Sequence, residues 1–283
     1  MDKQQVKKIE LGTFIGLTMA LCATVRSIPT LAAVGWTLIS YTIFAVLFFA
    51  GPIALISGEL STMLPQEGGP QLWVKTALGS KWGFVVAWLL WVQMFPGMVM
   101  VASTLGPLLG NTFGNVHLGE NHWFVLGCIL VIYWIITILN LKFDMAKVGG
   151  NIGVWLGVYI PVLVMFVLGL LSMIKVGLTP GGYLGAFSWS KVLPNLENMD
   201  TFKYLAGIAF IFVGIEMSSV YIPRLKDATK NYTKGVFISL IGLVLLNVIN
   251  AMFVANIVPN GKMELSNITQ PILLYCDVLG LPT

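Results

Sequence analysis

Charged side chains are scarce in this chain of 283 residues, because Asp, Glu, Lys and Arg together make up only 10% of it. A soluble domain carries roughly 25% charged residues, since its water-facing surface must be covered with polar groups. The shortage excludes an ordinary soluble protein, and 57% of the residues are hydrophobic. Apolar runs of about 20 residues cross a bilayer as helices. We therefore predict an all-α integral membrane protein without a soluble domain.

Motifs of enzyme active sites are missing as well. The sequence has no Gly-rich phosphate loop with its Lys, no Gly-x-Ser-x-Gly turn and no His-Glu-x-x-His. Its three cysteines, Cys22, Cys128 and Cys276, show no paired spacing, which disfavours a disulfide framework or a metal site. We predict that the protein is not an enzyme and uses neither a cofactor nor a metal.

Seven apolar runs are long enough to cross a membrane. We place them at about 9–34, 38–60, 82–109, 123–141, 150–174, 204–222 and 235–258. The first run lacks a small-residue cleavage site after its apolar stretch, and further spans follow it. We therefore interpret it as a retained span and not as a signal peptide.

Lysine and arginine are distributed unevenly between the segments that connect these spans. If the N-terminus is cytoplasmic, the inner segments hold most of them, including Lys75, Lys142 and Lys226, whereas Lys191 is one of the few in outer segments. This bias follows the positive-inside rule, so we predict a multi-pass protein of the plasma membrane with a cytoplasmic N-terminus. The net charge of +4 is then a topology signal, and no nucleic-acid partner is expected, because such binding needs a clustered basic surface.

The first span contains features that disrupt a membrane helix. Its run "GLTMALCATVRSIPT" is rich in small and polar residues and includes Arg26 and Pro29. Proline removes a backbone donor and clashes with the preceding turn. A charged arginine deep in lipid costs at least ~2.5 kcal/mol, so Arg26 must face protein, water or the outer interface. Two interpretations stay open: a break at residues 18–23, or a helix that ends near Val25 while Arg26 extends toward the outer surface.

A glutamate interrupts the sixth apolar run, which reads "IAFIFVGIEMSSVYI". Gly214 precedes Glu216 by two positions, and Ser218 and Ser219 follow it. An ionised carboxylate cannot face hydrocarbon, so Glu216 must be paired, hydrated or protonated. Two spans broken near the midplane would offer helix N-termini to a substrate carboxylate and free carbonyls to a cation or an ammonium group. An amino acid carries both kinds of group.

The stretch "FIFVGIEMSSVYIPRLKDATKNYTKG" resembles the sixth-helix signature of the amino acid–polyamine–organocation (APC) superfamily, most closely that of its glutamate/GABA antiporter branch. The stretches "VRSIPTLAAVGW", "FFAGPIALISGELSTMLPQEGGPQLWVKTALGSKWGF" and "WVQM" carry the same resemblance, which runs through essentially the whole chain. It implies a LeuT-type fold of five helices followed by five inverted ones. By this resemblance, residues 1–283 form a single transmembrane domain. Its first repeat covers about 9–174, its second begins at about 203–258, and 259–283 is an outer-loop segment.

The resemblance also implies a substrate site between the breaks of the first and sixth helices. Carried over by position, the breaks fall at residues 18–23 and 211–215, Glu216 matches the family's Glu, and Gln93 matches a Gln of the third helix. Arg26 departs from the family pattern and is a candidate for tuning substrate charge. The candidate substrate-binding residues are Thr18, Met19, Ala20, Leu21, Cys22, Ala23, Arg26, Gln93, Ile211, Phe212, Val213, Gly214, Ile215 and Glu216.

Several polar residues also have a purely structural interpretation. Gln93 taken alone would form a hydrogen bond between helices. Asn247 and Asn250 lie three positions apart on one face of the seventh span, which favours helix contact. Glu59 lies near the inner end of the second span, so we expect it at the interface or paired with another group, and not in contact with substrate. Near the end, "LSNITQPILLYCDVLG" predicts a short helix in an outer loop, a candidate lid over the outer cavity.

The predicted function is amino-acid transport, with exchange against an amine or a decarboxylation product as the leading mode. Proton-coupled uptake is an alternative. The chain stops before any eighth span, so we expect either a fragment of a longer transporter or a truncated product that does not transport. A seven-span sensor is disfavoured by an outer C-terminus, and a channel by the small number of polar residues in the spans. The expected partners are the lipid bilayer and a small amino acid or amine. The sequence leaves open whether the protein forms a homodimer.

Overall fold

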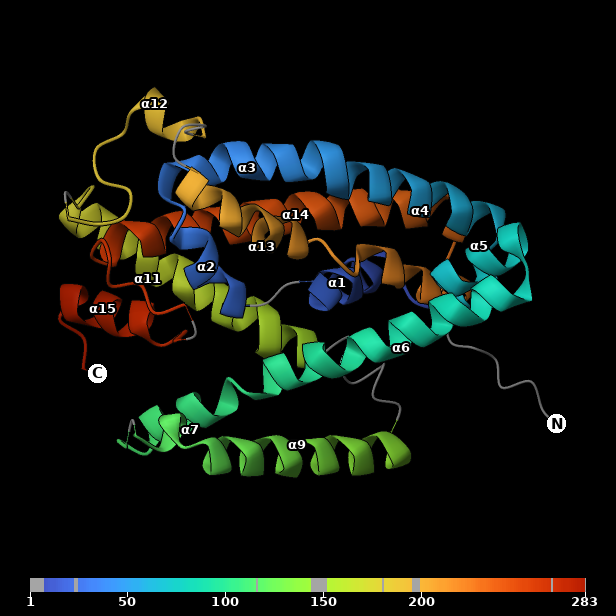
Figure 1. The fold of residues 1–283 in the computed structure, drawn as a ribbon, viewed down its shortest axis with the longest axis horizontal. Coiled ribbons are helices and arrows are strands. Elements are labelled where there is room, and N and C mark those ends of the chain that lie inside the picture. Colours follow the sequence, from blue (N-terminus) through green and yellow to red (C-terminus); the bar gives the residue numbers. More distant parts are fainter. Residues whose placement is uncertain are drawn as a thin grey trace.

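The computed structural model describes residues 8–22, 25–115, 117–143, 152–179, 181–194, 199–265 and 267–282. This part of the chain is helical, and its extended pairing consists of two isolated bridges, Ile9 with Leu225 and Gly182 with Pro259. The helices run mainly along the long axis of the molecule (Figure 1).

Helical elements of very different lengths follow one another along the chain. The first half comprises α1 (Leu11–Cys22), η1 (Val25–Ser27), α2 (Ile28–Ala32), η2 (Gly35–Thr37), α3 (Leu38–Ala45), η3 (Val46–Ala50), α4 (Gly51–Met63), α5 (Gly69–Leu78), α6 (Ser80–Ala102), α7 (Leu105–Thr112), α8 (His117–Glu120) and α9 (His122–Lys142). The second half comprises η5 (Trp155–Tyr159), α11 (Ile160–Val176), α12 (Trp189–Val192), η6 (Met199–Tyr204), α13 (Leu205–Phe210), η7 (Ile215–Arg224), α14 (Ala228–Ile257) and α15 (Gln270–Leu279).

Six helical stretches are long and apolar enough to cross a membrane, and the bent pair formed by α1 with Val25–Ala32 makes up to seven. The six are Gly35–Met63, Ser80–Thr112, His122–Lys142, Trp155–Val176, Phe202–Arg224 and Ala228–Ile257. They coincide with the predicted spans, so the all-α membrane architecture is confirmed. The predicted start of the fifth span at residue 150 lies outside the described residues.

The core of the molecule lies around α14, which packs against α1, α2, α4 and α11. Phe14 of α1 and Tyr232 of α14 are fully buried, and their rings lie 5.4 Å apart. Glycine allows this close approach, since a Cβ on Gly235 would lie 2.5 Å from the ring of Phe14. Figure 1 shows α14 along the middle of the molecule, between α3–α4 and α2–α11.

Two spans contain a widened π-helical turn just before a proline. The turn η3 precedes Pro52, and the turn η5 precedes Pro161. Proline has no N–H for the carbonyl four residues earlier, and its ring crowds that carbonyl. A local π turn relieves the steric clash and tolerates the missing hydrogen bond without ending the helix.

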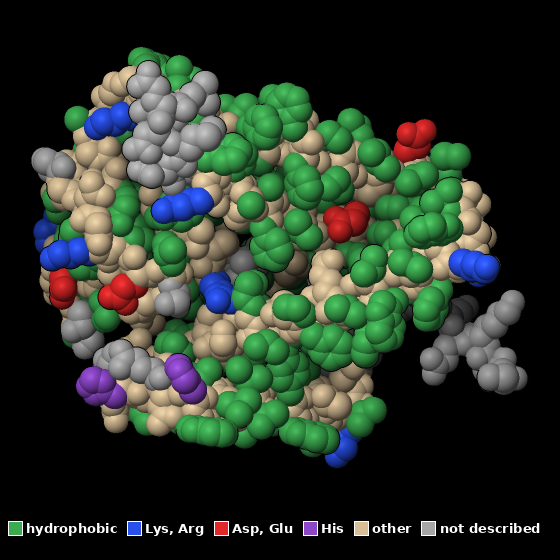
Figure 2. All heavy atoms as spheres, in the orientation of Figure 1, with side chains coloured by type: hydrophobic (Ala, Val, Ile, Leu, Met, Phe, Trp, Pro, Cys, Tyr) green, Lys and Arg blue, Asp and Glu red, His purple; other side chains and the backbone are tan. Residues whose placement is uncertain are grey.

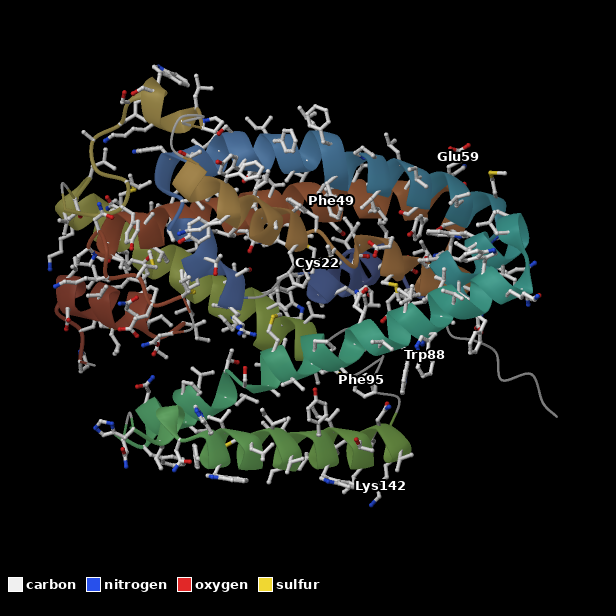
Figure 3. The ribbon with its side chains drawn as sticks, in the orientation of Figure 1. Cys22, Phe49, Glu59, Trp88, Phe95 and Lys142 are labelled. Atoms are coloured by element: carbon white, nitrogen blue, oxygen red, sulfur yellow. The ribbon has the colours of Figure 1, made fainter. Side chains whose placement is uncertain are left out.

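Large apolar side chains cover much of the outer surface. Trp88 and Phe95 lie on the lower side of α6 in Figure 3, the side on which α9 runs, and both are more than half exposed. Hydrophobic side chains dominate the middle of the face in Figure 2, while most Lys and Arg lie toward its left and right ends. This pattern suits hydrocarbon in the middle and water at both ends, as in a multi-pass membrane protein.

Candidate functional site

The first span is bent at its centre. Helix α1 ends at Cys22, η1 begins at Val25, and the two helical segments differ in direction by 43°. The expectation of non-helical backbone from Thr18 onward is wrong for residues 18–22, which are helical, and Ala23 lies outside the described residues. The hydroxyl of Thr18 donates to the carbonyl of Phe14 at 2.9 Å and so fits within the helix. Pro29 lies in the first turn of α2, where its missing N–H and fixed φ suit the start of a helix, so the second half of the span begins anew after the bend.

The sixth span breaks where the sequence predicts. Helix α13 ends at Phe210, turns occupy residues 211–214, and the 3₁₀ helix η7 starts at Ile215. Gly214 has φ 102° and ψ −8°. A side chain is disfavoured in this left-handed region, so glycine is the residue that permits the turn.

The Glu216 carboxylate folds back onto this turn. Its Oε2 accepts a hydrogen bond from the backbone N–H of Gly214 at 3.1 Å. Glu216 lies in the first turn of η7, where unpaired N–H groups and the helix dipole favour negative charge. The side chain is half-buried. The glutamate therefore satisfies a donor that the break leaves without a helical partner.

The two breaks lie against each other. The thiol of Cys22 donates to the carbonyl of Val213 at 3.6 Å. A Cβ placed on Gly214 would lie 3.7 Å from the carbonyl oxygen of Leu21. Figure 3 shows Cys22 at the centre of the molecule, and Figure 2 shows the surface hollowed there, where α1, α2 and α13 meet in Figure 1. The structure thus brings Leu21, Cys22, Val213, Gly214 and Glu216 together at one hollow.

Other candidate residues of the breaks point into the core. Ala20 is half-buried. The side chains of Thr18, Met19, Ile211, Phe212 and Ile215 are buried. These buried residues can offer a ligand only their backbone groups, because their side chains are already packed.

Arg26 contacts protein and is half-buried. Its Nη1 donates to the carbonyl of Met100 at 2.5 Å, and the hydroxyl of Ser103 donates to the same carbonyl at 2.9 Å. Met100 lies in the last turn of α6, where carbonyls lack helical partners and attract positive charge. Sequence reasoning did not find Met100, because an apolar side chain gives no signal about its backbone carbonyl.

The structure does not bring Gln93 together with the residues at the two breaks. It is exposed on α6, and α6 packs chiefly on α5. Asn247 and Asn250 are buried, and each side-chain amide donates to a carbonyl of its own helix, those of Leu243 and Leu246. Glu59 is exposed and points outward from α4 (Figure 3).

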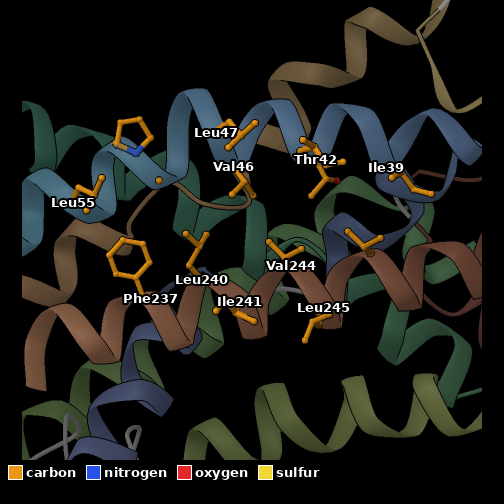
Figure 4. A pocket seen from close by; sticks show the side chains of 14 residues that line it. Ile39, Thr42, Val46, Leu47, Leu55, Phe237, Leu240, Ile241, Val244 and Leu245 are labelled. Atoms are coloured by element: carbon orange, nitrogen blue, oxygen red, sulfur yellow. The ribbon is translucent and has the colours of Figure 1, made fainter.

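An apolar groove lies apart from the hollow. It has a volume of about 660 Å³ and opens between α3–η3–α4 and α14 (Figure 4). Thr42 is the polar residue among side chains that are otherwise apolar or glycine. Such a lining offers nothing to a charged substrate. Among the described residues, no group of three or more His, Cys, Asp or Glu could hold a metal ion.

Two broken spans that meet at a carboxylate, within a bundle of apolar helices, are an arrangement typical of membrane transporters. The chain belongs to the amino acid permease family, whose pattern matches residues 9–282. It is therefore a member of a transporter family and not an enzyme. Recognition of the APC superfamily is confirmed at this level, whereas the glutamate/GABA branch is not distinguished from others.

Several transporters are similar to this chain. An uncharacterized transporter of Legionella pneumophila is 27% identical over 98% of this chain and 59% of its own length. The probable agmatine/putrescine antiporter AguD of Lactococcus lactis is 23% identical over 98% of this chain and 57% of its own length. A probable polyamine transporter of Arabidopsis thaliana is 30% identical over 63% of this chain and 35% of its own length. The chain thus spans less than two thirds of the length of these relatives.

Proposed function

We propose that this chain forms the first part of a permease that exchanges an amino acid for an amine, such as its decarboxylation product. The observation that carries the proposal is the meeting of the two breaks beside Glu216, with its carboxylate bound to Gly214. Support for the amine comes from two of the relatives, which are named for agmatine, putrescine and polyamines. Support for the amino acid comes from the family. The glutamate/GABA branch fits this exchange mode.

The chemistry of the hollow suits both substrates. Turns that replace helix leave carbonyls able to accept from an ammonium group, and the N-terminus of a half-helix favours a carboxylate. We propose that the substrate site is built from backbone groups of residues 211–215 together with Glu216, and from those of residues 18–23, of which the carbonyls at the end of α1 lack helical partners. Gln93 and Arg26 would contribute from the periphery, Gln93 only after α6 moves closer.

The arrangement of the spans supports an inverted repeat. A broken span, α1 with α2, is followed by the long span α3–α4, and a second broken span, α13 with η7, is followed by the long span α14. We propose that residues 9–174 form one repeat of a single transmembrane domain and that 203–258 begin the second. Residues 259–283 would belong to an outer loop, with α15 as its helix.

The test is exchange by the full-length transporter in proteoliposomes. Vesicles loaded with agmatine or with an amino acid should take up a labelled partner in a saturable manner, at least tenfold faster than unloaded vesicles. Equal uptake by loaded and empty vesicles that follows an imposed pH gradient would instead support proton-coupled uptake. If no loading gives uptake, the proposal is wrong, and the result supports the alternative of a membrane protein that does not transport.

We also propose an orientation in the plasma membrane with the N-terminus cytoplasmic. Lys142 lies at the right end of α9, and α12, which carries Lys191, lies at the left end of the molecule (Figures 1 and 3). In intact cells an impermeant thiol reagent should label Lys191→Cys and should label Lys142→Cys only after the membrane is opened. Cys128→Ser and Cys276→Ser would remove the two partly exposed cysteines, and the remaining Cys22 is buried. Labelling of position 142 from outside would reverse the orientation.

A further inference from the structure

The apolar groove between α3–η3–α4 and α14 has a buried floor and exposed rims. Among the side chains that line it, Thr42 and Leu240 are buried. Leu47, Leu55 and Ile241 are each more than half exposed. Both walls belong to membrane spans, so the groove opens toward hydrocarbon. A hydrocarbon chain is therefore the kind of molecule that suits it.

The length of the apolar groove matches one leaflet of a bilayer. On α14 the lining runs from Phe237 to Val248, a stretch of about 17 Å at the helical rise. The hydrocarbon of one leaflet is about 15 Å thick, half of the bilayer core. The opposite wall runs from Ile39 to Leu55 and is longer, about 24 Å. The shorter wall sets the length that both share, and one acyl chain of one leaflet would fill it.

One end of the apolar groove carries a charge on each wall. Leu55 and Phe237 lie opposite each other at this end (Figure 4). Glu59 follows Leu55 by four positions, and Lys234 precedes Phe237 by three. Residues at these spacings share a helix face, so each charge lies one turn beyond the lining of its own wall. Both side chains are exposed.

The two walls touch beside these charges. A Cβ placed on Gly58 would lie 2.8 Å from the hydroxyl oxygen of Thr233. Glu59 and Lys234 follow this contact directly, and within the described chain they form no ion pair with each other. The carboxylate and the ammonium group therefore flank the end of the groove as two separate charges.

The charges around this end balance. Lys230 lies one turn from Lys234 on α14, and Asp227 is the N-cap of that helix. Together with Glu59 they make two positive and two negative groups. A purely anionic headgroup would meet as much repulsion as attraction there, whereas a headgroup that carries both signs would meet opposite charges.

We propose that the apolar groove binds an acyl chain of phosphatidylethanolamine, with the phosphate of this lipid at Lys234 and its ammonium group at Glu59. A phosphate oxygen accepts a charge-assisted hydrogen bond from lysine. A primary ammonium group has three N–H donors for a carboxylate, whereas the quaternary nitrogen of choline has none. The inference uses the membrane spans and their charges, and it does not rest on the proposed exchange.

The test measures which lipid the full-length transporter retains. The protein in detergent is offered equal amounts of phosphatidylethanolamine, phosphatidylglycerol and phosphatidylcholine with identical acyl chains, and bound lipid is counted by native mass spectrometry. Phosphatidylethanolamine should be retained at least fivefold more than either other lipid. Lys234→Gln and Glu59→Gln should each reduce its retention at least fivefold, whereas Lys142→Gln at the end of α9 should not. Equal retention of the three lipids, or unchanged retention in both groove variants, would overturn the proposal.

A second pair of variants tests the groove itself. Ile241→Trp should fill it and reduce retention of phosphatidylethanolamine at least fivefold. Ile241 is 58% exposed, so the larger side chain should leave the melting temperature unchanged. Ile135→Trp on α9, at a residue 51% exposed, is the matched control and should stay within twofold of the wild type. Equal retention in the two tryptophan variants would contradict binding in the groove.

A nitroxide label at position 241 tests whether protein covers the groove instead. In a bilayer, dissolved oxygen should reach the label, because oxygen concentrates in hydrocarbon. A label shielded from oxygen, in a transporter that retains no lipid, would mean that another part of the full-length protein fills the groove. That result would overturn the lipid site and leave the proposed exchange untouched.

Discussion

Glu216→Leu is expected to abolish substrate binding in the full-length transporter, whereas Glu216→Gln should retain it. The carboxylate accepts from the N–H of Gly214 at 3.1 Å. Glutamine keeps an acceptor oxygen at nearly the same place, and leucine leaves the donor unsatisfied at a half-buried break. A buried donor without a partner costs about 1–3 kcal/mol. The Leu variant should therefore melt at a lower temperature in detergent and lose exchange.

Radiolabelled exchange at two pH values separates two roles of the same carboxylate. If Glu216 only accepts the hydrogen bond, Gln should exchange like the wild type at both pH values. If Glu216 also carries a proton, Gln should exchange but lose the pH dependence. Wild-type exchange, pH response and melting temperature in the Leu variant would contradict both roles.

Gly214→Ala is expected to disrupt the break of the sixth span. Gly214 has φ 102°, a conformation that costs a residue with a Cβ about 1–3 kcal/mol. Space is not the obstacle, because the added Cβ would lie 3.7 Å from its nearest neighbour. The strain would pull the turn toward helical geometry and displace the N–H that Glu216 accepts from. We expect a lower melting temperature and at least a tenfold loss of exchange.

Gly207→Ala is the matched control for this prediction. Gly207 lies in α13 of the same span, where an added Cβ would meet Thr30 at an ordinary contact distance of 3.7 Å. Alanine in a helix is favoured over glycine by about 0.5–1 kcal/mol. This variant should be as stable as the wild type or more stable, with normal exchange. Equal behaviour of the two alanine variants would contradict a role for the left-handed turn.

The sequence alone determined the class and the layout of this protein. Hydropathy located the spans, because hydrocarbon imposes one length and one composition on every spanning helix; the largest miss is the start of α14, which begins at Ala228 and not at the predicted residue 235. Gly214 and Glu216 located the sixth break, because both residues are poor choices for the middle of a membrane helix. The family resemblance followed from the same stretch, and residues 9–282 match that family.

The position of the first break was predicted less well. Small and polar residues from Thr18 onward suggested unwinding, but a small residue tolerates a helix as readily as a turn. Thr18 satisfies its hydroxyl on the carbonyl of Phe14, within the helix. Small and polar residues mark a stretch where unwinding costs little free energy, whereas the tertiary contacts at the end of α1, such as that of Cys22 with Val213, depend on how the helices pack.

Only the tertiary structure decided which groups meet. Arg26 bonds a carbonyl of Met100, Cys22 bonds one of Val213, and Ile9 pairs with Leu225. Backbone carbonyls are the acceptors in these contacts between distant segments, and a backbone group is the same in every residue. Gln93 shows the converse, since its side chain is distinctive but the packing of α6 on α5 leaves it exposed. The sequence specifies the chemistry of each side chain directly, whereas the pairing of backbone groups depends on how the helices pack.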